Sequence, residues 1–308
     1  MSRIHEALKK AEQERVAAQG GATQPTIATA PPIEPVVEAS EPIDIVSRSV
    51  AAPVPDFGAS YSPEAILARC PQFEWKPDLS AMLFMNGTDN GKGTEEYRTL
   101  RSRLYHLREK MTLRTLLVTS ALPQEGKSFT ASNLAQVLVR QHGRRVLLID
   151  GDLRGPRLHQ MLGTSVGPGL SEYLQGKNDE FSIMQRGPIE NLYFVPSGAS
   201  IADPSELVGS ERLKTLVDRL ESLFDWIIID SPPAVPLSDA SLLAKACDGV
   251  LIVVRSNSTP SDIARRARME FPDQVLVGVV LNGTSRDSVP YARYYYEAYE
   301  KNGNGAKS

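Results

Sequence analysis

The sequence predicts an α/β fold with three layers, in which a mostly parallel sheet has helices on both of its faces. Six short apolar runs recur between residues 115 and 282, and segments with helical periodicity separate them. Apolar strands that alternate with helices form parallel sheets, and such sheets bind ligands at the carboxyl ends of their strands. The expected strands are residues 115–120, 146–150, 192–195, 226–230, 249–254 and 275–282.

Residues 1–19 predict an amphipathic helix that precedes the globular part of the chain. Ile4, Ala7, Leu8 and Ala11 fall on one helical face, and charged residues surround it. A helix this short is marginally stable alone, so it is either a frayed end or a docking handle for a partner.

The composition of the chain changes after this helix and marks the domain boundaries. Residues 20–63 contain eight prolines among Ala, Thr, Ser and Glu, which predicts a flexible, disordered linker rather than a packed core. Residues 64–89 form a poorly defined connecting segment. The globular domain is expected at residues 90–288, followed by a tyrosine-rich tail at residues 289–308.

The clearest helical pattern of the domain follows Ser210, which has the residue type of an N-cap. The apolar residues after it recur at helical spacing and define one face. They are Leu213, Leu216, Val217, Leu220, Leu223 and Phe224.

Composition and charge exclude several classes of function. The chain of 308 residues has a formal net charge of −3, so we expect no nucleic-acid partner. Cys70 and Cys247 are the two cysteines, too few and too far apart for a disulfide framework or a zinc site. The apolar runs are shorter than the ~20 residues of a membrane span. The polar N-terminus is unlike a secretory signal, so we expect a cytoplasmic protein.

The stretch ALPQEGKSF at residues 121–129 follows an expected strand and leads into an expected helix at residues 128–141. When a strand, a tight loop and a helix follow one another in this order, the backbone N–H groups of the loop and the helix dipole both point at a bound phosphate. Gly126 allows close approach, whereas Ala121 fits only with an ordinary backbone conformation. A Gly-Lys-Ser tripeptide also arises by chance. The expected nucleotide-binding residues of this loop are Gln124, Glu125, Gly126, Lys127, Ser128 and Phe129.

Carboxylates follow two further strands. Asp150 and Asp152 come at the end of VLLIDGDLR, with Arg154 after them, and Asp230 ends WIIID. An aspartate at such a position either holds Mg²⁺ at the rim of the sheet or caps the next helix or turn. Three carboxylates at two strand ends, beside a phosphate-loop pattern at a third, favour a metal-nucleotide site.

Three motifs together resemble those of the bacterial tyrosine kinases of capsule and exopolysaccharide systems. ALPQEGKS is similar to their Walker A motif, VLLIDGDLR to Walker A′ and WIIIDSPP to Walker B. The resemblance covers roughly residues 90–300 and implies a P-loop NTPase fold, ATP and Mg²⁺ as cofactors, and protein tyrosine as substrate.

Two further segments match this family. Glu95, Arg98 and Arg101 reproduce its E-x-x-R-x-x-R element, which the resemblance implies serves ring-like self-association; the alternative is a solvated helix face with ion pairs. For the tyrosine-rich tail at residues 289–308, the resemblance implies autophosphorylation by a neighbouring subunit. The alternative is that these tyrosines form a surface interaction patch. The tail tyrosines are Tyr291, Tyr294, Tyr295, Tyr296 and Tyr299.

Phosphoryl transfer depends on positioning and on stabilising charge around the γ-phosphate. We expect Lys127 to bind phosphate, Ser128 and Asp230 to bind Mg²⁺, and Asp152 to bind the metal or its water shell. Asp150 is the candidate base for the tyrosine hydroxyl.

Arg154 is expected to orient the incoming tyrosine or to stabilise the transferred charge. Asn282, at the end of the last expected strand, either contacts adenine, as in related nucleotide-binding folds, or is a turn residue of an Asn-Gly pair.

Two alternative functions share this fold. One is a partitioning ATPase switch, although such proteins carry a second lysine early in the loop and residues 121–125 contain none. The other is a nucleotide-sensing scaffold that does not turn over ATP. The kinase resemblance implies a separate membrane adaptor of the polysaccharide co-polymerase, chain-length determinant type. The protein would then lie at the inner face of the plasma membrane through this adaptor.

Overall fold

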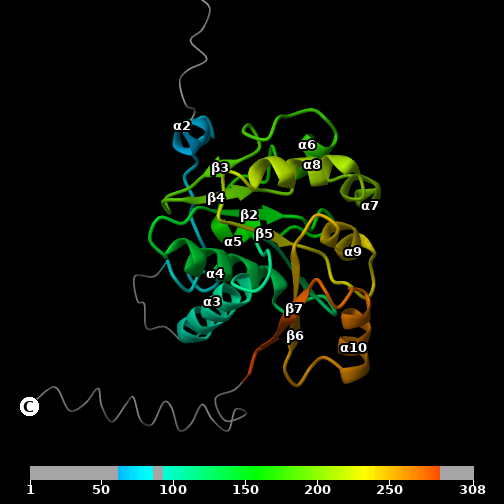
Figure 1. Cartoon of the computed structure of the whole chain (residues 1–308). Helices are drawn as coiled ribbons and strands as arrows, with labels where there is room; N and C mark the ends of the chain where they lie inside the picture. The colour runs from blue at the N-terminus through cyan, green and yellow to red at the C-terminus, as the bar shows by residue number, and fades with distance from the viewer. Residues whose placement is uncertain (1–61, 86–92, 285–308) are drawn as a thin grey trace, which may run out of the picture. The chain divides into compact units, whose positions relative to one another are not determined.

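The computed structural model describes residues 62–85 and 93–284, and these form a seven-stranded sheet between two layers of helices (Figure 1). The expected N-terminal helix, the linker up to residue 61 and the tyrosine-rich tail lie outside the described residues. Among the described helices, none is both long enough and apolar enough to cross a membrane. The predicted α/β class and its covered, mostly parallel sheet are confirmed.

The strand order is β3-β4-β2-β5-β1-β6-β7. Every neighbouring pair is parallel except β3 and β4, which are antiparallel. The six expected strands all form, within one residue of their expected ends, and β3 is a short additional edge. The strands are β1 (Thr115–Ser120), β2 (Val146–Asp150), β3 (Gln185–Arg186), β4 (Leu192–Val195), β5 (Trp226–Asp230), β6 (Gly249–Arg255) and β7 (Leu276–Asn282).

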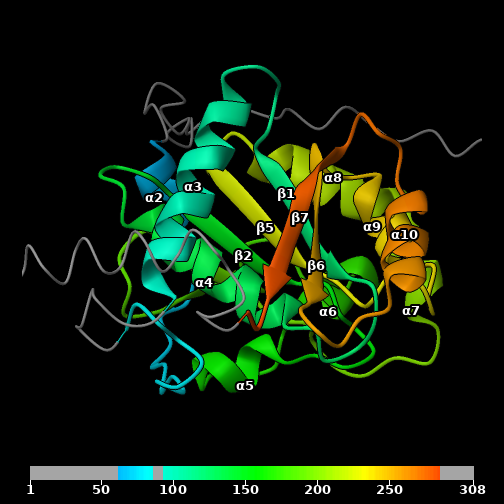
Figure 2. The ribbon, with the colours of Figure 1, turned by 90° about the horizontal axis from the view of Figure 1, so that it is seen from below.

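The helices lie on both faces of the sheet, with α3 and α4 on one side and α8, α9 and α10 on the other (Figure 2). Most of them connect consecutive parallel strands, as crossover helices do. They are α2 (Pro63–Leu67), α3 (Thr94–Arg108), α4 (Lys127–Val139), α5 (Leu158–Leu162), α6 (Leu170–Leu174), α7 (Pro204–Val208), α8 (Glu211–Leu220), α9 (Asp239–Ala244) and α10 (Ser261–Met269).

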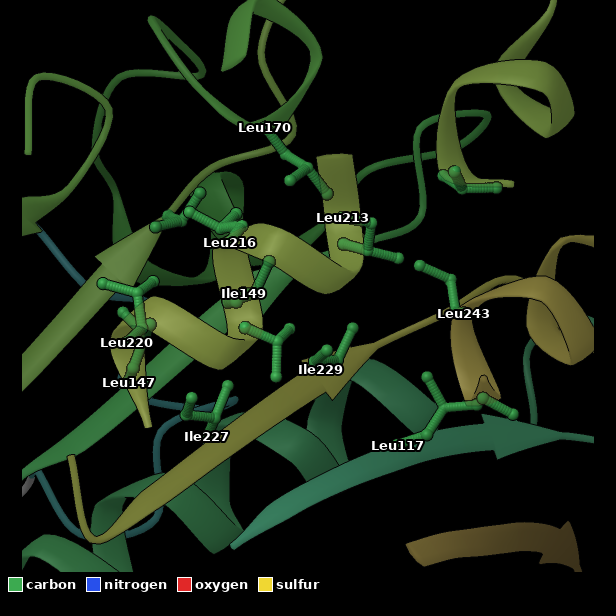
Figure 3. Close-up of a cluster of buried hydrophobic side chains, with 14 of the residues drawn as sticks. Leu117, Leu147, Ile149, Leu170, Leu213, Leu216, Leu220, Ile227, Ile229 and Leu243 are labelled. Carbon is green, nitrogen blue, oxygen red and sulfur yellow. The ribbon is translucent and has the colours of Figure 1, made fainter. Parts of the chain in front are cut away.

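Two hydrophobic cores flank the sheet because successive side chains of a strand point to opposite faces. In β5, Ile227 and Ile229 join the core beneath α8 and α9, whereas Trp226 and Ile228 join the core beneath α3 and α4. Figure 3 shows the first of these cores, where Leu216 of α8 is completely buried. Because β5 is buried on both faces, its residues are apolar up to Asp230 and do not alternate between apolar and polar.

The apolar face expected after Ser210 is buried, and the helix begins at the next residue as predicted. The Ser210 side chain does not cap it, however. Its hydroxyl donates instead to the carbonyl of Leu207 in the last turn of α7 at 2.6 Å, and the backbone N–H of Ser210 donates to the same carbonyl at 3.1 Å.

Residues 62–85 pack against the domain, although their sequence predicts only a connecting segment. The Trp75 ring lies edge-on to Phe194 at 6.2 Å between centroids, and it covers Gly187, where an added Cβ would lie 2.3 Å from the ring. Asn133 of α4 accepts a hydrogen bond from the N–H of Leu83 at 2.8 Å. These contacts belong to a polar and aromatic packing that has no periodic sequence pattern.

Candidate active site

The candidate site lies at the carboxyl ends of five neighbouring strands, β2, β5, β1, β6 and β7. The phosphate loop follows β1, and Asp150 and Asp230 end β2 and β5, where they are paired in register. The backbone N–H of Gly151 donates to the carbonyl of Asp230 at 2.8 Å and joins the two strand ends. Parallel order therefore brings together motifs that are about 100 residues apart in sequence.

The loop between β1 and α4 has the conformation that a phosphate loop requires. Ala121 is completely buried in the apolar core and is not among the residues with positive φ, so alanine fits there. Gly126 has a φ of 96°, and a Cβ at this position would lie 2.0 Å from the amide nitrogen of Asn282. Gln124, although not glycine, also has a positive φ of 65°.

Lys127 is buried at the start of α4 and binds a carboxylate. Its Nζ lies 2.7 Å from Oδ2 of Asp152 and 3.4 Å from the hydroxyl oxygen of Ser128. Burial disfavours its charge, but Asp230, Asp152 and Asp150 outweigh this effect and raise the pKa of the Lys127 ammonium. The lysine therefore remains charged inside the site.

Asp150 and Asp230 are both completely buried, but their surroundings differ. The Asp150 carboxylate accepts the backbone N–H groups of Asp152 at 3.3 Å and Leu158 at 3.1 Å. Neither oxygen of Asp230 has a hydrogen-bond partner within the described residues. Burial raises the pKa of Asp230 to about 6, although Lys127 opposes the shift, and burial together with the charge of Asp230 raises the pKa of Asp150 well above its usual range.

Arg154 does not join the carboxylates around Lys127. Its guanidinium forms a two-pronged ion pair with Asp239 of α9, at 2.6 Å and 3.2 Å, and donates to the hydroxyl of Ser205 at 2.8 Å. Burial opposes the ionisation of Asp239, but the hydrogen bonds that Arg154 and Ser205 donate to its carboxylate lower its pKa. Sequence reasoning missed Asp239 and Ser205, because each has the position of an ordinary residue at the start of a short helix.

Residues from β6 and β7 hold the loop from the other side. Asn282 donates to the carbonyl of Glu125 at 2.9 Å, and Arg255 donates to the carbonyl of Gln124 at 3.1 Å. Thr259 donates its hydroxyl to the buried carboxylate of Glu125. The sequence left Asn282 open between a contact with adenine and a turn residue, and gave no signal for Arg255, the last residue of β6, or for Thr259 in the polar turn that follows.

The remaining predicted residues lie further from the loop or outside the described chain. Phe129 lies partly buried on α4 and packs against Tyr97, with 6.3 Å between ring centroids. On α3, Glu95 and Arg98 form an ion pair, whereas Arg101 turns inward and donates to the carbonyl of Val137 at 3.0 Å. The five tail tyrosines fall among residues that the structure does not describe.

Comparison with known proteins relates the chain to nucleotide-binding proteins and tyrosine kinases. The family described as AAA domain matches residues 124–261. Tyrosine-protein kinase YwqD of Bacillus subtilis is 32% identical over 204 residues, which cover 66% of this chain and 86% of YwqD. Tyrosine-protein kinase wzc of Salmonella typhimurium is 32% identical over 222 residues, which cover 71% of this chain but 31% of wzc. The chain therefore spans most of one relative and about a third of the other.

Solved structures give the same relationship. The chimerical protein CapA2B2 matches with a TM-score of 0.63 and 28% identity, over 72% of this chain and 97% of that chain. The kinase domain of the Escherichia coli tyrosine kinase ETK matches with a TM-score of 0.57 and 30% identity, over 62% of this chain and 75% of that chain. The septum site-determining protein MinD of Pyrococcus horikoshii matches with a TM-score of 0.50 and 23% identity, over 59% of this chain and 77% of that chain, which shows the fold alone.

Proposed function

The chain belongs to the family of bacterial tyrosine-protein kinases, and from this premise we propose that it transfers the γ-phosphoryl group of ATP to tyrosines, including its own C-terminal cluster. The membership inferred from the three motifs is thereby confirmed. One observation carries the proposal. Lys127, Ser128 and three buried aspartates from neighbouring strand ends meet around a loop with the shape of a phosphate site.

The residues present fit Mg²⁺. Asp230 offers a buried carboxylate whose two oxygens have no protein partner within the described residues, and the Ser128 hydroxyl lies at the start of the adjacent helix. No group of three or more metal-binding His, Cys, Asp or Glu side chains occurs in residues 62–85 and 93–284. Mg²⁺ at nucleotide sites takes one or two protein carboxylates together with phosphate oxygens and water, and neutralises phosphate charge there.

In this proposal the ion pair between Lys127 and Asp152 opens when ATP binds. The lysine ammonium leaves the Asp152 carboxylate, 2.7 Å away, and takes phosphate oxygens in its place. Asp152 is then available to the metal or its water shell. Because Lys127 is buried, its charge is weakly screened and acts strongly on the transferred phosphoryl group.

Asp150 acts as the base that accepts the proton of the tyrosine hydroxyl. A tyrosine with a pKa near ~10 is mostly protonated at neutral pH, so a positioned base assists its attack. Two backbone N–H groups fix the direction of the Asp150 carboxylate at the end of β2. Arg154, held by Asp239, orients the incoming tyrosine or stabilises transferred charge from the rim of the site.

The substrate tyrosines come from a neighbouring subunit in a homo-oligomer. The ion pair between Glu95 and Arg98 lies on the solvent side of α3 and offers both charges to that neighbour. Phosphorylation adds about 1.5 to 2 negative charges to each tail tyrosine, and repulsion within the cluster then releases the tail.

The kinase regulates exopolysaccharide or capsule synthesis together with a membrane adaptor of the polysaccharide co-polymerase type. The adaptor meets the N-terminal segment at residues 1–19, for which the sequence predicts a helix, or the loops near the nucleotide, and thereby holds the kinase at the inner face of the membrane. Deletion of residues 1–63 should weaken co-purification with the adaptor and leave ATP affinity unchanged. Loss of both together would contradict the domain boundary.

Autophosphorylation of the purified chain with Mg-ATP, measured by intact mass, tests the proposal. We expect wild type to gain several phosphate masses, whereas Lys127→Met and a truncation after Pro290 gain none. Lys214→Met is the matched control, because Lys214 is an exposed lysine that pairs with Asp218 on α8. ATP binding without any phosphate gain, with and without the adaptor's cytoplasmic segment, would contradict the kinase and favour a scaffold.

A further inference from the structure

The phosphate loop has an unusual backbone for its sequence. Between Ala121 and Ser128 the only glycine is Gly126. Gln124 nevertheless has a φ of 65°, in the left-handed region that a side chain disfavours. Such a conformation persists only where surrounding contacts hold it.

Two side chains from the neighbouring strands supply those contacts. Arg255, at the end of β6, donates from Nη1 to the carbonyl oxygen of Gln124 at 3.1 Å. Asn282, at the end of β7, donates to the next carbonyl, that of Glu125, at 2.9 Å. Both bonded carbonyls belong to peptides in the middle of the loop.

Holding these carbonyls also sets the direction of the N–H groups that bind phosphate. In a trans peptide the C=O and N–H bonds point in opposite directions. The bond to Gln124 therefore turns the N–H of Glu125 away from β6, and the bond to Glu125 turns the N–H of Gly126 away from β7. Within the described residues neither N–H donates to a partner, so both remain available to an anion.

Thr259 completes a second connection between the loop and the turn after β6. Its hydroxyl accepts the backbone N–H of Arg255 at 3.1 Å and donates to the carboxylate of Glu125. The other oxygen of this carboxylate accepts the N–H of Leu122 at 2.7 Å. Glu125 is 3% exposed, so its carboxylate, at the centre of this connection, is largely shielded from water.

We propose that Arg255 and Thr259 are positioning residues for ATP, which brace the loop at Gln124 and Glu125 and replace the conformational freedom that a glycine would supply. This inference rests on the proposed ATP site. It assigns a role in phosphate binding to Arg255, the last residue of β6, and to Thr259, in the turn that follows, and both act through the loop without contact with the nucleotide. The brace matters because position 124 carries a side chain.

The test measures Mg-ATP affinity by titration calorimetry for Arg255→Met and Thr259→Val, two variants that keep side-chain volume and lose the hydrogen bonds. We expect the Kd for Mg-ATP to rise about fivefold in each, with little change in the thermal midpoint of the free protein. Thr259→Ser should retain the wild-type Kd. Arg266→Met is the matched control, because Arg266 lies exposed on α10.

A double variant separates the brace from a direct contact between Arg255 and ATP. Glycine adopts a positive φ readily, so adding Gln124→Gly to Arg255→Met should bring the Kd back to within about twofold of Gln124→Gly alone. The same fivefold loss in the Gln124→Gly background would overturn the proposal, as would an unchanged Kd in Arg255→Met. A wild-type protein that fails to bind Mg-ATP would overturn the proposed function itself.

Discussion

Asp230→Asn should stabilise the ligand-free protein while it abolishes kinase activity. Asp230 is completely buried, and neither of its oxygens has a hydrogen-bond partner within the described residues. Burial raises its pKa to about 6. Raising a carboxyl pKa from about 3.9 to about 6 corresponds to about 3 kcal/mol at neutral pH. The neutral amide avoids this cost, so the variant should unfold with a free energy up to about 3 kcal/mol larger than wild type.

The stability difference should depend on pH with a definite sign. The folded state binds the Asp230 proton more tightly than the unfolded state, so the ionised side chain destabilises the fold above pH 6. This penalty falls as pH decreases through 6 toward the unfolded pKa near ~4. The advantage of Asp230→Asn should therefore fall to roughly half its neutral value by pH 5.

Urea denaturation at pH 7 and pH 5, without nucleotide or Mg²⁺, measures both effects. Asp218→Asn is the control, because this aspartate is 56% exposed on α8 and pairs with Lys214, so its replacement should change stability by less than about 1 kcal/mol. An Asp230→Asn variant that is less stable than wild type at pH 7 would refute the reasoning, and so would an advantage of equal size at both pH values. Phosphate incorporation with Mg-ATP should be lost in this variant, because Asp230 is a proposed metal ligand.

Three further predictions concern the loop, the N-terminal packing and the rim of the site. Gly126→Ala should weaken Mg-ATP binding at least tenfold by calorimetry, because φ is 96° and the new Cβ would meet Asn282; unchanged affinity would contradict the described loop. Trp75→Ala should lower the unfolding free energy by about 3 kcal/mol in urea, since this ring is 5% exposed; no loss would mean that residues 62–85 do not pack as described. Arg154→Met should cost about 1 kcal/mol at pH 7, because Asp239 loses its ion pair and its lowered pKa. This stabilisation is complete above the unfolded pKa near ~4 and is lost as pH falls through the lowered folded pKa, so the cost should shrink from pH 7 to pH 3; a cost that does not shrink would contradict this role.

The sheet and the carboxylates could be predicted because their patterns are local and strong. The buried strands β2 and β5 are continuous apolar runs up to their last residues, and Asp150 and Asp230 follow these runs directly. Strand ends meet at one edge of a parallel sheet, so finding the strands also places these residues together. The edge strand β3 has two residues and therefore gives no usable pattern.

The rest of the site could not be predicted, because its polar residues act through tertiary contacts. Arg255, the last residue of β6, and Thr259, in the turn that follows, lie 131 and 134 residues after the loop positions that they bind. Asp239 binds Arg154 from 85 residues away. The segment that contains Trp75 packs on the domain through one aromatic pair with Phe194 and scattered hydrogen bonds such as that from Leu83 to Asn133. None of these pairings has a period or a spacing in the sequence that distinguishes it from an ordinary loop.

The same buried charges that weaken the free protein make it responsive to its ligand. Asp150 and Asp230 are adjacent, completely buried and both raised in pKa, and Lys127 offsets their charge only in part. A cation bound beside Asp150 and Asp230 would supply positive charge where both carboxylates are buried, so occupation of the site by Mg²⁺ and nucleotide should offset part of the cost of burying them.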